Sequence, residues 1–204
     1  MYLPAQFAAP DDALTLELMR RHPFATLIST DAEGAPFATH LPVVVAAGEQ
    51  GVRLDFHLAR ANPHVAMLRA GAPSMLAFLG PNAYLSPTVY PDRQRVPTWN
   101  YIAAHAYGRL DEVTTEVDKD ALLKSLIALH EPAYAEQWRG LEAAFQRAML
   151  SAIAAFRLTV TRLEGKFKLN QHRPESHTAM LAAYGAGDTD ERELAEWLRR
   201  LTRA

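Results

Sequence analysis

The sequence predicts an α+β fold in which an antiparallel β-barrel is decorated by helices. Alternating apolar and polar residues recur between residues 24 and 110, and turn-forming residues separate most of these runs. From residue 116 the apolar spacing becomes helical, and one more alternating run returns near residue 156. Because the strands are not regularly alternated with long crossover helices, a barrel is favoured over a mixed α/β sheet.

The composition is that of a globular protein. The chain has 204 residues, of which 49% are hydrophobic and none is cysteine. A chain of this length can bury a core without disulfides or structural metal, and the lack of cysteine excludes thiolate metal sites and cysteine nucleophiles. We treat residues 1–204 as one domain with a helical C-terminal extension at about 175–204.

The net charge and the hydropathy indicate which kinds of partner and which cellular location to expect. The 21 Lys and Arg residues against 23 Asp and Glu residues give a formal charge of −2, which is not typical of a protein that grips nucleic acid over a broad surface. No apolar run approaches the ~20 residues of a membrane span, and the N-terminal segment lacks the features of a secretory signal. The sequence therefore predicts a cytoplasmic protein without a membrane partner.

The first half begins with a short helix and continues mainly as strands. Asp11 and Asp12 favour a helix start, and Pro23 ends that helix after Arg21. The expected strands lie at 24–30, 35–45, 52–58, 74–79, 84–86 and 99–110. A short helix is expected from Pro63 to about Ala70, and a Pro-rich loop separates the last two strands.

The second half is mainly helical. Helices are expected between Glu116 and Leu150, with a break near Pro132. One late strand is expected around residues 156–161, followed by a loop at 164–174. Residues 188–203 have the spacing of an amphipathic helix.

The segment His57–Pro63 places a cation and a capped helix start at the end of a strand. The guanidinium of Arg60 can bind two phosphate oxygens at once, and Asn62 can cap the helix that follows. This arrangement suits a phosphate. An ordinary capped helix with a solvated arginine has the same sequence, so both interpretations stay open.

Two further segments concentrate polar and aromatic groups. Val96–Tyr101 combines a hydroxyl, an amide and two aromatic rings, which suits a planar heterocycle or core packing of Trp99 and Tyr101 with Asn100 bonded to a turn. Glu164–Pro174 is rich in basic and amide side chains and is expected as either a binding loop or a solvated turn. The histidines show no HExxH or comparable spacing, so no metal site is predicted.

Several short segments, taken in order, resemble one known family. They are Met1–Pro4, Ala38–Pro42, Ala59–Pro63, Gly80–Pro87, Val96–Tyr101, His105–Gly108 and Leu163–Leu169. Together they resemble the PaiB family of FMN-binding negative transcriptional regulators, within the flavin-binding split-barrel group related to pyridoxamine 5′-phosphate oxidases. The resemblance covers almost the whole chain.

The resemblance implies a split barrel, a homodimer and an FMN at the dimer interface. It assigns the FMN phosphate to Ala59, Arg60 and Asn62, the flavin ring to the strand with His40 and Leu41, and the ribityl chain to His57. From the partner subunit Ser86, Thr98, Trp99 and Asn100 complete the pocket, and Lys168 and Gln171 approach it from the last loop. The chain departs from the family at Val89 and Phe167, where tryptophan is usual, and at Asn170–His172, where Ser-Gln-Asn is usual. We expect less aromatic surface near the pocket and a change in hydrogen bonding at its edge.

The function implied is that of an FMN-binding regulator of the PaiB type. Two alternatives stay open: a flavin-dependent oxidoreductase that acts on a small molecule, and a haem-binding split-barrel protein. Direct DNA contact is open as well, although neither the net charge nor a helix-turn-helix pattern supports it.

Overall fold

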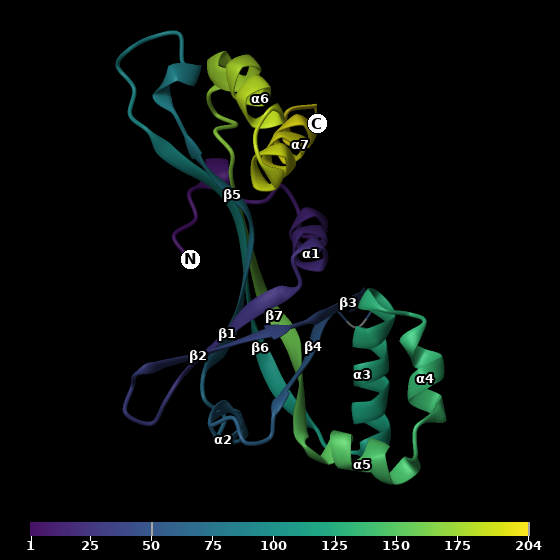
Figure 1. Cartoon of the computed structure of the whole chain (residues 1–204). Helices are drawn as coiled ribbons and strands as arrows, with labels where there is room; N and C mark the ends of the chain where they lie inside the picture. The colour runs from purple at the N-terminus through teal and green to yellow at the C-terminus, as the bar shows by residue number, and fades with distance from the viewer. Residues whose placement is uncertain (50, 204) are drawn as a thin grey trace. The chain divides into compact units, whose positions relative to one another are not determined.

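Figure 1 presents the computed structural model of the chain, which describes residues 1–49 and 51–203. Gln50, in the turn expected between the strands at 35–45 and 52–58, lies outside the described residues. The strands are β1 (Phe24–Thr30), β2 (Pro36–Pro42), β3 (Val44–Gly48), β4 (Gly51–Ala59), β5 (Ser74–Leu85), β6 (Thr98–Val113) and β7 (Ile153–Lys168). The helices are α1 (Asp12–Arg21), α2 (His64–Arg69), α3 (Glu116–His130), α4 (Tyr134–Gly140), α5 (Ala143–Ser151), α6 (His177–Gly185) and α7 (Thr189–Arg203).

The described residues form one seven-stranded sheet with the order β2-β1-β5-β6-β7-β4-β3. The pairs β1/β2, β1/β5, β3/β4 and β4/β7 are antiparallel. An antiparallel sheet with helices in separate stretches of the chain is an α+β fold, as predicted. Within the described residues, no helix combines the length and the apolar character that crossing a membrane requires.

The ends of several elements differ from the sequence prediction. The strand expected at 35–45 is two strands, because β2 pairs with β1 and β3 pairs with β4, with Val43 between them. The strands expected at 74–79 and 84–86 are the single strand β5. The loop expected from residue 164 begins only after Lys168, because Lys166 and Phe167 are buried and continue β7.

The chain divides into two compact units, and β5, β6 and β7 each run from one unit into the other. Unit 1 comprises Met1–His22, Leu79–His105 and Glu164–Ala204, and unit 2 comprises Pro23–Phe78 and Ala106–Leu163. The single domain expected from the sequence stays a prediction.

The core of unit 2 is built by alternation along its strands. On β4 the side chains of Leu54, Phe56 and Leu58 are buried among those of β7, where Phe156 stacks on Phe56 with ring centroids 6.0 Å apart. Each large apolar side chain buried in this way contributes about 1.5–3 kcal/mol. In Figure 1 the helices α3, α4 and α5 form a cluster within this unit.

The core of unit 1 lies around helices α1 and α7. Trp197 of α7 is fully buried and meets Phe167 of β7 edge to face, with ring centroids 5.4 Å apart. At Gly80 an added Cβ would lie 2.5 Å from Leu18 of α1 and 3.3 Å from the Ile102 carbonyl oxygen. Glycine therefore lets the helix approach β5 closely. Helix α6 packs against α7, as Figure 1 shows.

Candidate functional site

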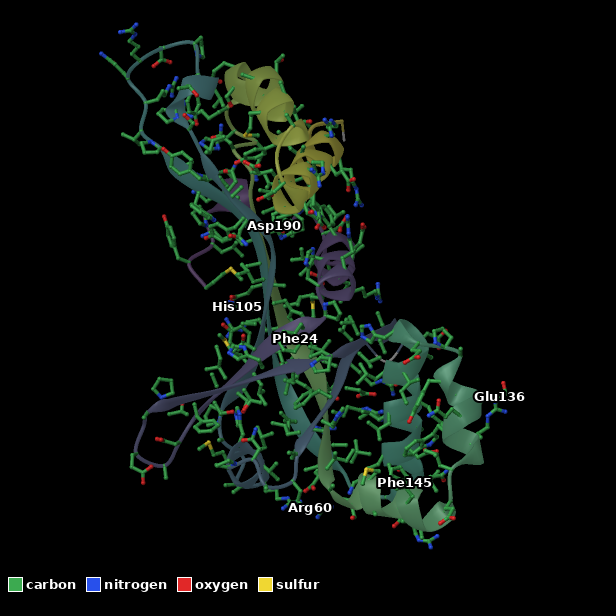
Figure 2. The ribbon with its side chains drawn as sticks, in the orientation of Figure 1. Phe24, Arg60, His105, Glu136, Phe145 and Asp190 are labelled. Atoms are coloured by element: carbon green, nitrogen blue, oxygen red, sulfur yellow. The ribbon has the colours of Figure 1, made fainter. Side chains whose placement is uncertain are left out.

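Arg60 of unit 2 is a surface cation whose direction is fixed by the main chain. It directly follows β4, and its Nε donates to the Ser151 carbonyl oxygen at 2.6 Å while Nη2 donates to the Ile153 carbonyl oxygen at 3.3 Å. Figure 2 places Arg60 where α5 leads into β7. A guanidinium has more N–H donors than these two bonds use, so the side chain can still bind an anion.

Asn62 lies one residue before the N-cap of α2, which is Pro63 and not Asn62 as the sequence predicted. Its Oδ1 accepts from the N–H of His64 at 2.9 Å, and α2 begins at His64. The Asn62 carbonyl oxygen accepts from the N–H of Val65 at 3.0 Å. Because these two amides of the helix start already have partners, the positive charge of the turn comes mainly from Arg60.

Behind this turn lies a buried histidine that the sequence did not single out. His64 is fully buried; its Nδ1 is 2.9 Å from Thr39 Oγ1 and its Nε2 is 2.7 Å from Ser29 Oγ. Ser29 Oγ is 2.6 Å from Ser74 Oγ. Burial lowers the pKa of His64, so the neutral ring is favoured.

The direction of this chain of hydrogen bonds fixes the tautomer of His64. Ser74 donates to the Ala72 carbonyl oxygen at 2.8 Å, so Ser29 must donate to Ser74. His64 therefore donates from Nε2 to Ser29, and Nδ1 accepts from Thr39. Since the partners come from β1, β2 and β5, no local motif could reveal this network. The only sequence signal is that Ser29 occupies an inward position of a strand.

The other predicted residues of unit 2 have different surroundings. His40 is exposed on β2; its Nδ1 is 3.0 Å from Thr26 Oγ1 and its ring stacks on Phe24 with centroids 6.5 Å apart. Leu41, the next residue, is buried, so its side chain belongs to the core. His57 on β4 has a buried Nδ1 without a hydrogen-bond partner among the described residues, and burial lowers its pKa. A buried polar atom of this kind is typically satisfied by water or a ligand.

Unit 1 contains a cavity of about 360 Å³ that takes in three of the predicted site residues, Thr98, Asn100 and Lys168. Its lining residues are Tyr90, Gln94, Arg95, Val96, Thr98, Asn100, Lys168, Asn170, His172 and Arg173. The sequence analysis did not assign Tyr90 or Arg95 to a site, and it included Arg173 only as part of the segment Glu164–Pro174. They come from the Pro-rich loop and from the segment after β7, which only folding brings together.

Lys168 and Asn100 are the most constrained polar groups of this cavity. Lys168 Nζ donates to Thr98 Oγ1 at 2.6 Å and to the Trp99 carbonyl oxygen at 2.5 Å. Burial, together with the nearby Lys166, lowers the pKa of Lys168. Asn100 is 1% exposed, and its Nδ2 bonds to Tyr184 of α6 at 3.1 Å instead of to a turn.

Ser86, Trp99 and Gln171 do not line this cavity. Trp99 is 50% exposed, so its expected packing in the core is wrong, and its Nε1 donates to Asn82 Oδ1 at 3.2 Å. Ser86 Oγ accepts from the N–H of Thr88 at 3.2 Å. Gln171 Nε2 donates to the Phe167 carbonyl oxygen at 2.6 Å. Ser86 therefore stabilises a local turn, whereas Gln171, whose Nε2 also donates to the Gln6 carbonyl oxygen at 2.7 Å, connects the segment after β7 to the N-terminal segment as well.

Two of the three departures from the family pattern lie in the core, and the third includes Asn170 and His172, which line the cavity. Val89 is 8% exposed, and Phe167 is fully buried against Trp197. Replacing tryptophan at these positions therefore changes packing inside unit 1, not the aromatic surface of a pocket as we expected. Among the residues that the structure describes, no group of three or more His, Asp or Glu side chains is placed to hold a metal ion.

Comparison with known proteins places the chain in a family. The family model described as "Putative FMN-binding domain" matches residues 1–162. The chain belongs to this family. FMN is accordingly its cofactor, as the sequence resemblance implied.

Individual relatives agree with this assignment. The chain is 29% identical over 181 residues to the protease synthase and sporulation protein PAI 2 of Bacillus subtilis, covering 86% of this chain and 84% of the relative. It is 30% identical over 151 residues to an uncharacterized protein of Saccharomyces cerevisiae, covering 63% of this chain and 88% of the relative. The resemblance to PaiB proteins is thus confirmed.

Solved structures confirm the fold class. The FAD and heme binding protein from Mycobacterium smegmatis has a TM-score of 0.62 and 18% identity, over 79% of this chain and 73% of that chain. The flavocytochrome Anf3 from Azotobacter vinelandii has a TM-score of 0.63 and 18% identity, over 79% of this chain and 69% of that chain. The chain has the split-barrel fold of these flavin-binding proteins.

Proposed function

We propose that the chain is an FMN-binding protein of the PaiB type that holds its flavin between two copies of itself. The turn after β4 of one copy binds the phosphate, and unit 1 of the second copy covers the ring. The observation that carries this proposal is Arg60, an exposed guanidinium held in a fixed direction by two main-chain carbonyls. A cation fixed in advance loses little side-chain freedom on binding, which favours affinity.

The residues around Arg60 fit a phosphate and the polyol next to it. Ala59 is exposed and small, and Asn62 keeps an N–H beyond the one it gives to Thr39 at 3.3 Å. His57 offers a neutral ring with an unpaired Nδ1, which suits a hydroxyl donor of the ribityl chain. His40, with Leu41 behind it in the core, presents its ring on the exposed face of β2.

The residues of unit 1 fit the polar edge of a flavin ring. Asn100 offers an unpaired acceptor, Lys168 a positive charge, and Thr98 holds Lys168 in place. The bound FMN supplies one-electron and two-electron redox chemistry. Lys168 stabilises negative charge that develops at the ring edge. We assign the half-exposed Trp99 to the wall of the pocket, and Ser86 and Gln171 to the turns that support it.

Two observations support a dimer. Phe24 is 66% exposed on β1, next to the exposed face of β2 that carries His40. In unit 1, Trp99 and Tyr84 are half-exposed and meet edge to face, with ring centroids 6.4 Å apart. Large exposed apolar side chains of this kind are typical of surfaces that bind a partner, and a second copy of the chain is the partner we assign.

The experiment compares FMN with riboflavin, which lacks only the phosphate. We expect Arg60→Gln to weaken FMN binding about tenfold or more and to leave riboflavin binding nearly unchanged, because the lost bond is charge-assisted and specific to phosphate. Equilibrium titration of flavin fluorescence measures both affinities. The control is Arg147→Gln, which removes an exposed arginine from α5. Equal losses for both flavins would contradict the assignment of Arg60.

A second candidate, a flavin-dependent oxidoreductase, is favoured by the cavity beside Lys168, which leaves room for a small molecule. Steady turnover with a nicotinamide donor would test it.

The regulatory role implied by the PaiB resemblance predicts a sequence-selective, salt-dependent shift of DNA by the purified protein. The haem alternative and the cytoplasmic location stay predictions.

A further inference from the structure

The cavity of unit 1 has a positive charge that its own residues do not balance. Lys168, Arg95, Arg173 and His172 line it, and no aspartate or glutamate is among its lining residues. Arg95 is compensated from outside, since its Nη2 lies 2.8 Å from Asp92 Oδ2 and 3.4 Å from Glu175 Oε1. For Arg173, no ion pair is found within the part of the chain that the structure describes. Asp92 and Glu175 together offset two of the three cations Arg95, Arg173 and Lys168, and Arg173 helps to lower the pKa of Asp92, so one positive charge is left over, shared by Lys168 and Arg173.

The charge of Lys168 is directed by two bonds. Its Nζ donates to Thr98 Oγ1 and to the Trp99 carbonyl oxygen, and an ammonium group has one donor more than these bonds use. The pKa of Lys168 is lowered because burial and Lys166 both disfavour the cation. An anion bound next to Lys168 would favour the cation and so offset this lowering of its pKa.

Asn100, which lines the cavity, also has a hydrogen-bond acceptor without a donor in the described part of the chain. Tyr184 donates its hydroxyl proton to the Tyr84 carbonyl oxygen at 3.3 Å, and burial raises the pKa of Tyr184 to about 12, so the hydroxyl stays protonated. The Tyr184 oxygen must then accept from Asn100 Nδ2, at 3.1 Å. This bond fixes which way the amide points and leaves Asn100 Oδ1, in a side chain 1% exposed, without a partner among the described residues.

We propose that this cavity binds a small organic anion, a carboxylate or a phosphate ester, that also carries a hydrogen-bond donor. Arg173 and Lys168 bind the anionic group, and Asn100 Oδ1 accepts from the donor. A volume of 360 Å³ corresponds to about a dozen water molecules, which suits a ligand of about ten non-hydrogen atoms. Because the proposed function assigns Lys168 and Asn100 to the flavin edge as well, we expect the anion to compete with FMN for these two residues; its binding to the protein without FMN does not rest on the proposed function.

The experiment uses aromatic acids of matched shape, titrated by calorimetry into the FMN-loaded protein and into the protein without FMN. The probes are 3- and 4-hydroxybenzoate, benzoate, 4-hydroxybenzyl alcohol and phenyl phosphate. Benzoate lacks the donor, the alcohol lacks the charge, and phenyl phosphate distinguishes a phosphate from a carboxylate. The variants are Arg173→Gln and, as a matched control from an exposed position of the neighbouring loop outside this cavity, Arg93→Gln.

We expect at least one hydroxybenzoate to bind about tenfold more tightly than the neutral alcohol and several-fold more tightly than benzoate. Arg173→Gln should remove most of the difference in affinity between the hydroxybenzoate and the neutral alcohol, whereas Arg93→Gln should leave that difference unchanged. Equal affinity for the acids and the alcohol, an unaffected Arg173→Gln variant, or no binding of any acid at millimolar concentration would overturn the proposal.

The flavin is measured separately. If FMN binds and the acids do not bind even to the protein without FMN, the anion site is wrong and the proposed function stands. If FMN does not bind, the proposed function fails, and the titrations of the protein without FMN still decide the anion site.

Discussion

His64 is the residue whose environment departs furthest from what its neighbours in the sequence suggest. It is fully buried, its pKa is lowered by burial, and its ring joins Thr39 to Ser29 through the Nε2–H tautomer. A protonated ring would carry a hydrogen on Nδ1 as well, so Thr39 could no longer donate to it. The network therefore depends on a neutral histidine.

This dependence predicts how stability changes with pH. In the unfolded chain His64 takes up a proton near its ordinary pKa of about 6.5, whereas the folded chain takes it up only at lower pH. The unfolded state thus binds more protons below about pH 6.5, and the free energy of unfolding falls as the pH falls through that range. Chemical denaturation at pH 8, 7, 6 and 5 should show this decrease.

The variant His64→Gln should be about 2 kcal/mol less stable than the parent at pH 8, because the hydroxyl groups of Thr39 and Ser29 lose their hydrogen bonds to the ring. Its stability should then fall less between pH 7 and pH 5. The control is His130→Gln at the exposed end of α3. Parallel stability curves for the parent and His64→Gln would show that another group sets the pH dependence.

Single residues divide clearly into those that sequence can predict and those that it cannot. The bond between Asn62 and the first amide of α2, and the cation of Arg60 close by, follow from a few adjacent residues, because this interaction is local, although the N-cap itself is Pro63. The partners of Asn100 and His64 lie far away in the chain, on α6 and on two different strands. No local spacing encodes such contacts, so neither the unpaired Asn100 oxygen nor the histidine network could be predicted.

At the scale of elements, α7 shows how a helix outside the family match completes a unit. The match ends at residue 162, yet Trp197 of α7 is fully buried and Arg200 forms a two-bond pair with Glu17 of α1 at 2.6 and 2.7 Å. The Arg200 guanidinium lowers the pKa of Glu17. The amphipathic spacing predicted this helix, but not which element it covers.

Two tryptophans provide a matched test of this packing. Trp197→Ala should lower the free energy of unfolding by about 3–5 kcal/mol, the cost of a large cavity in a core. Trp99→Ala should cost much less, because Trp99 is 50% exposed. Urea denaturation of the two variants and the parent measures the difference. Similar losses would mean that α7 does not form part of the core of unit 1.

The elements themselves were predicted better than their ends. The alternation of residues predicted β4 correctly, and the cap residue Asp11 predicted the start of α1, because both signals lie in or directly beside the element. β7 was predicted too short, since Lys166 and Lys168 read as loop residues. Lys166 is 8% exposed and its Nζ donates to the Tyr2 carbonyl oxygen at 3.0 Å, an interaction that only the folded N-terminal segment supplies.

At the scale of the whole molecule, the proposed dimer predicts that an exposed apolar residue has a role in assembly. Phe24→Asp places a charge on the face of β1 that we assign to the second copy, and a buried unpaired charge is costly. We expect this variant to be monomeric and to bind FMN at least about tenfold more weakly. Sedimentation equilibrium gives the mass in solution.

The control for this variant is Val117→Asp, at a valine of α3 that is 78% exposed. It should leave the mass and the FMN affinity unchanged. A Phe24→Asp variant that stays dimeric would contradict the choice of this face.

The most direct measurement mixes two defective variants. Arg60→Gln removes the phosphate partner and Lys168→Gln removes the partner at the ring edge, so each homodimer should bind FMN weakly. If the two halves of a site come from different copies, a purified heterodimer of the two variants has one site with both defects and one site with none. We predict that this heterodimer binds one FMN per two chains with the affinity of the parent protein. A heterodimer that binds FMN as weakly as both homodimers would contradict a site shared between copies.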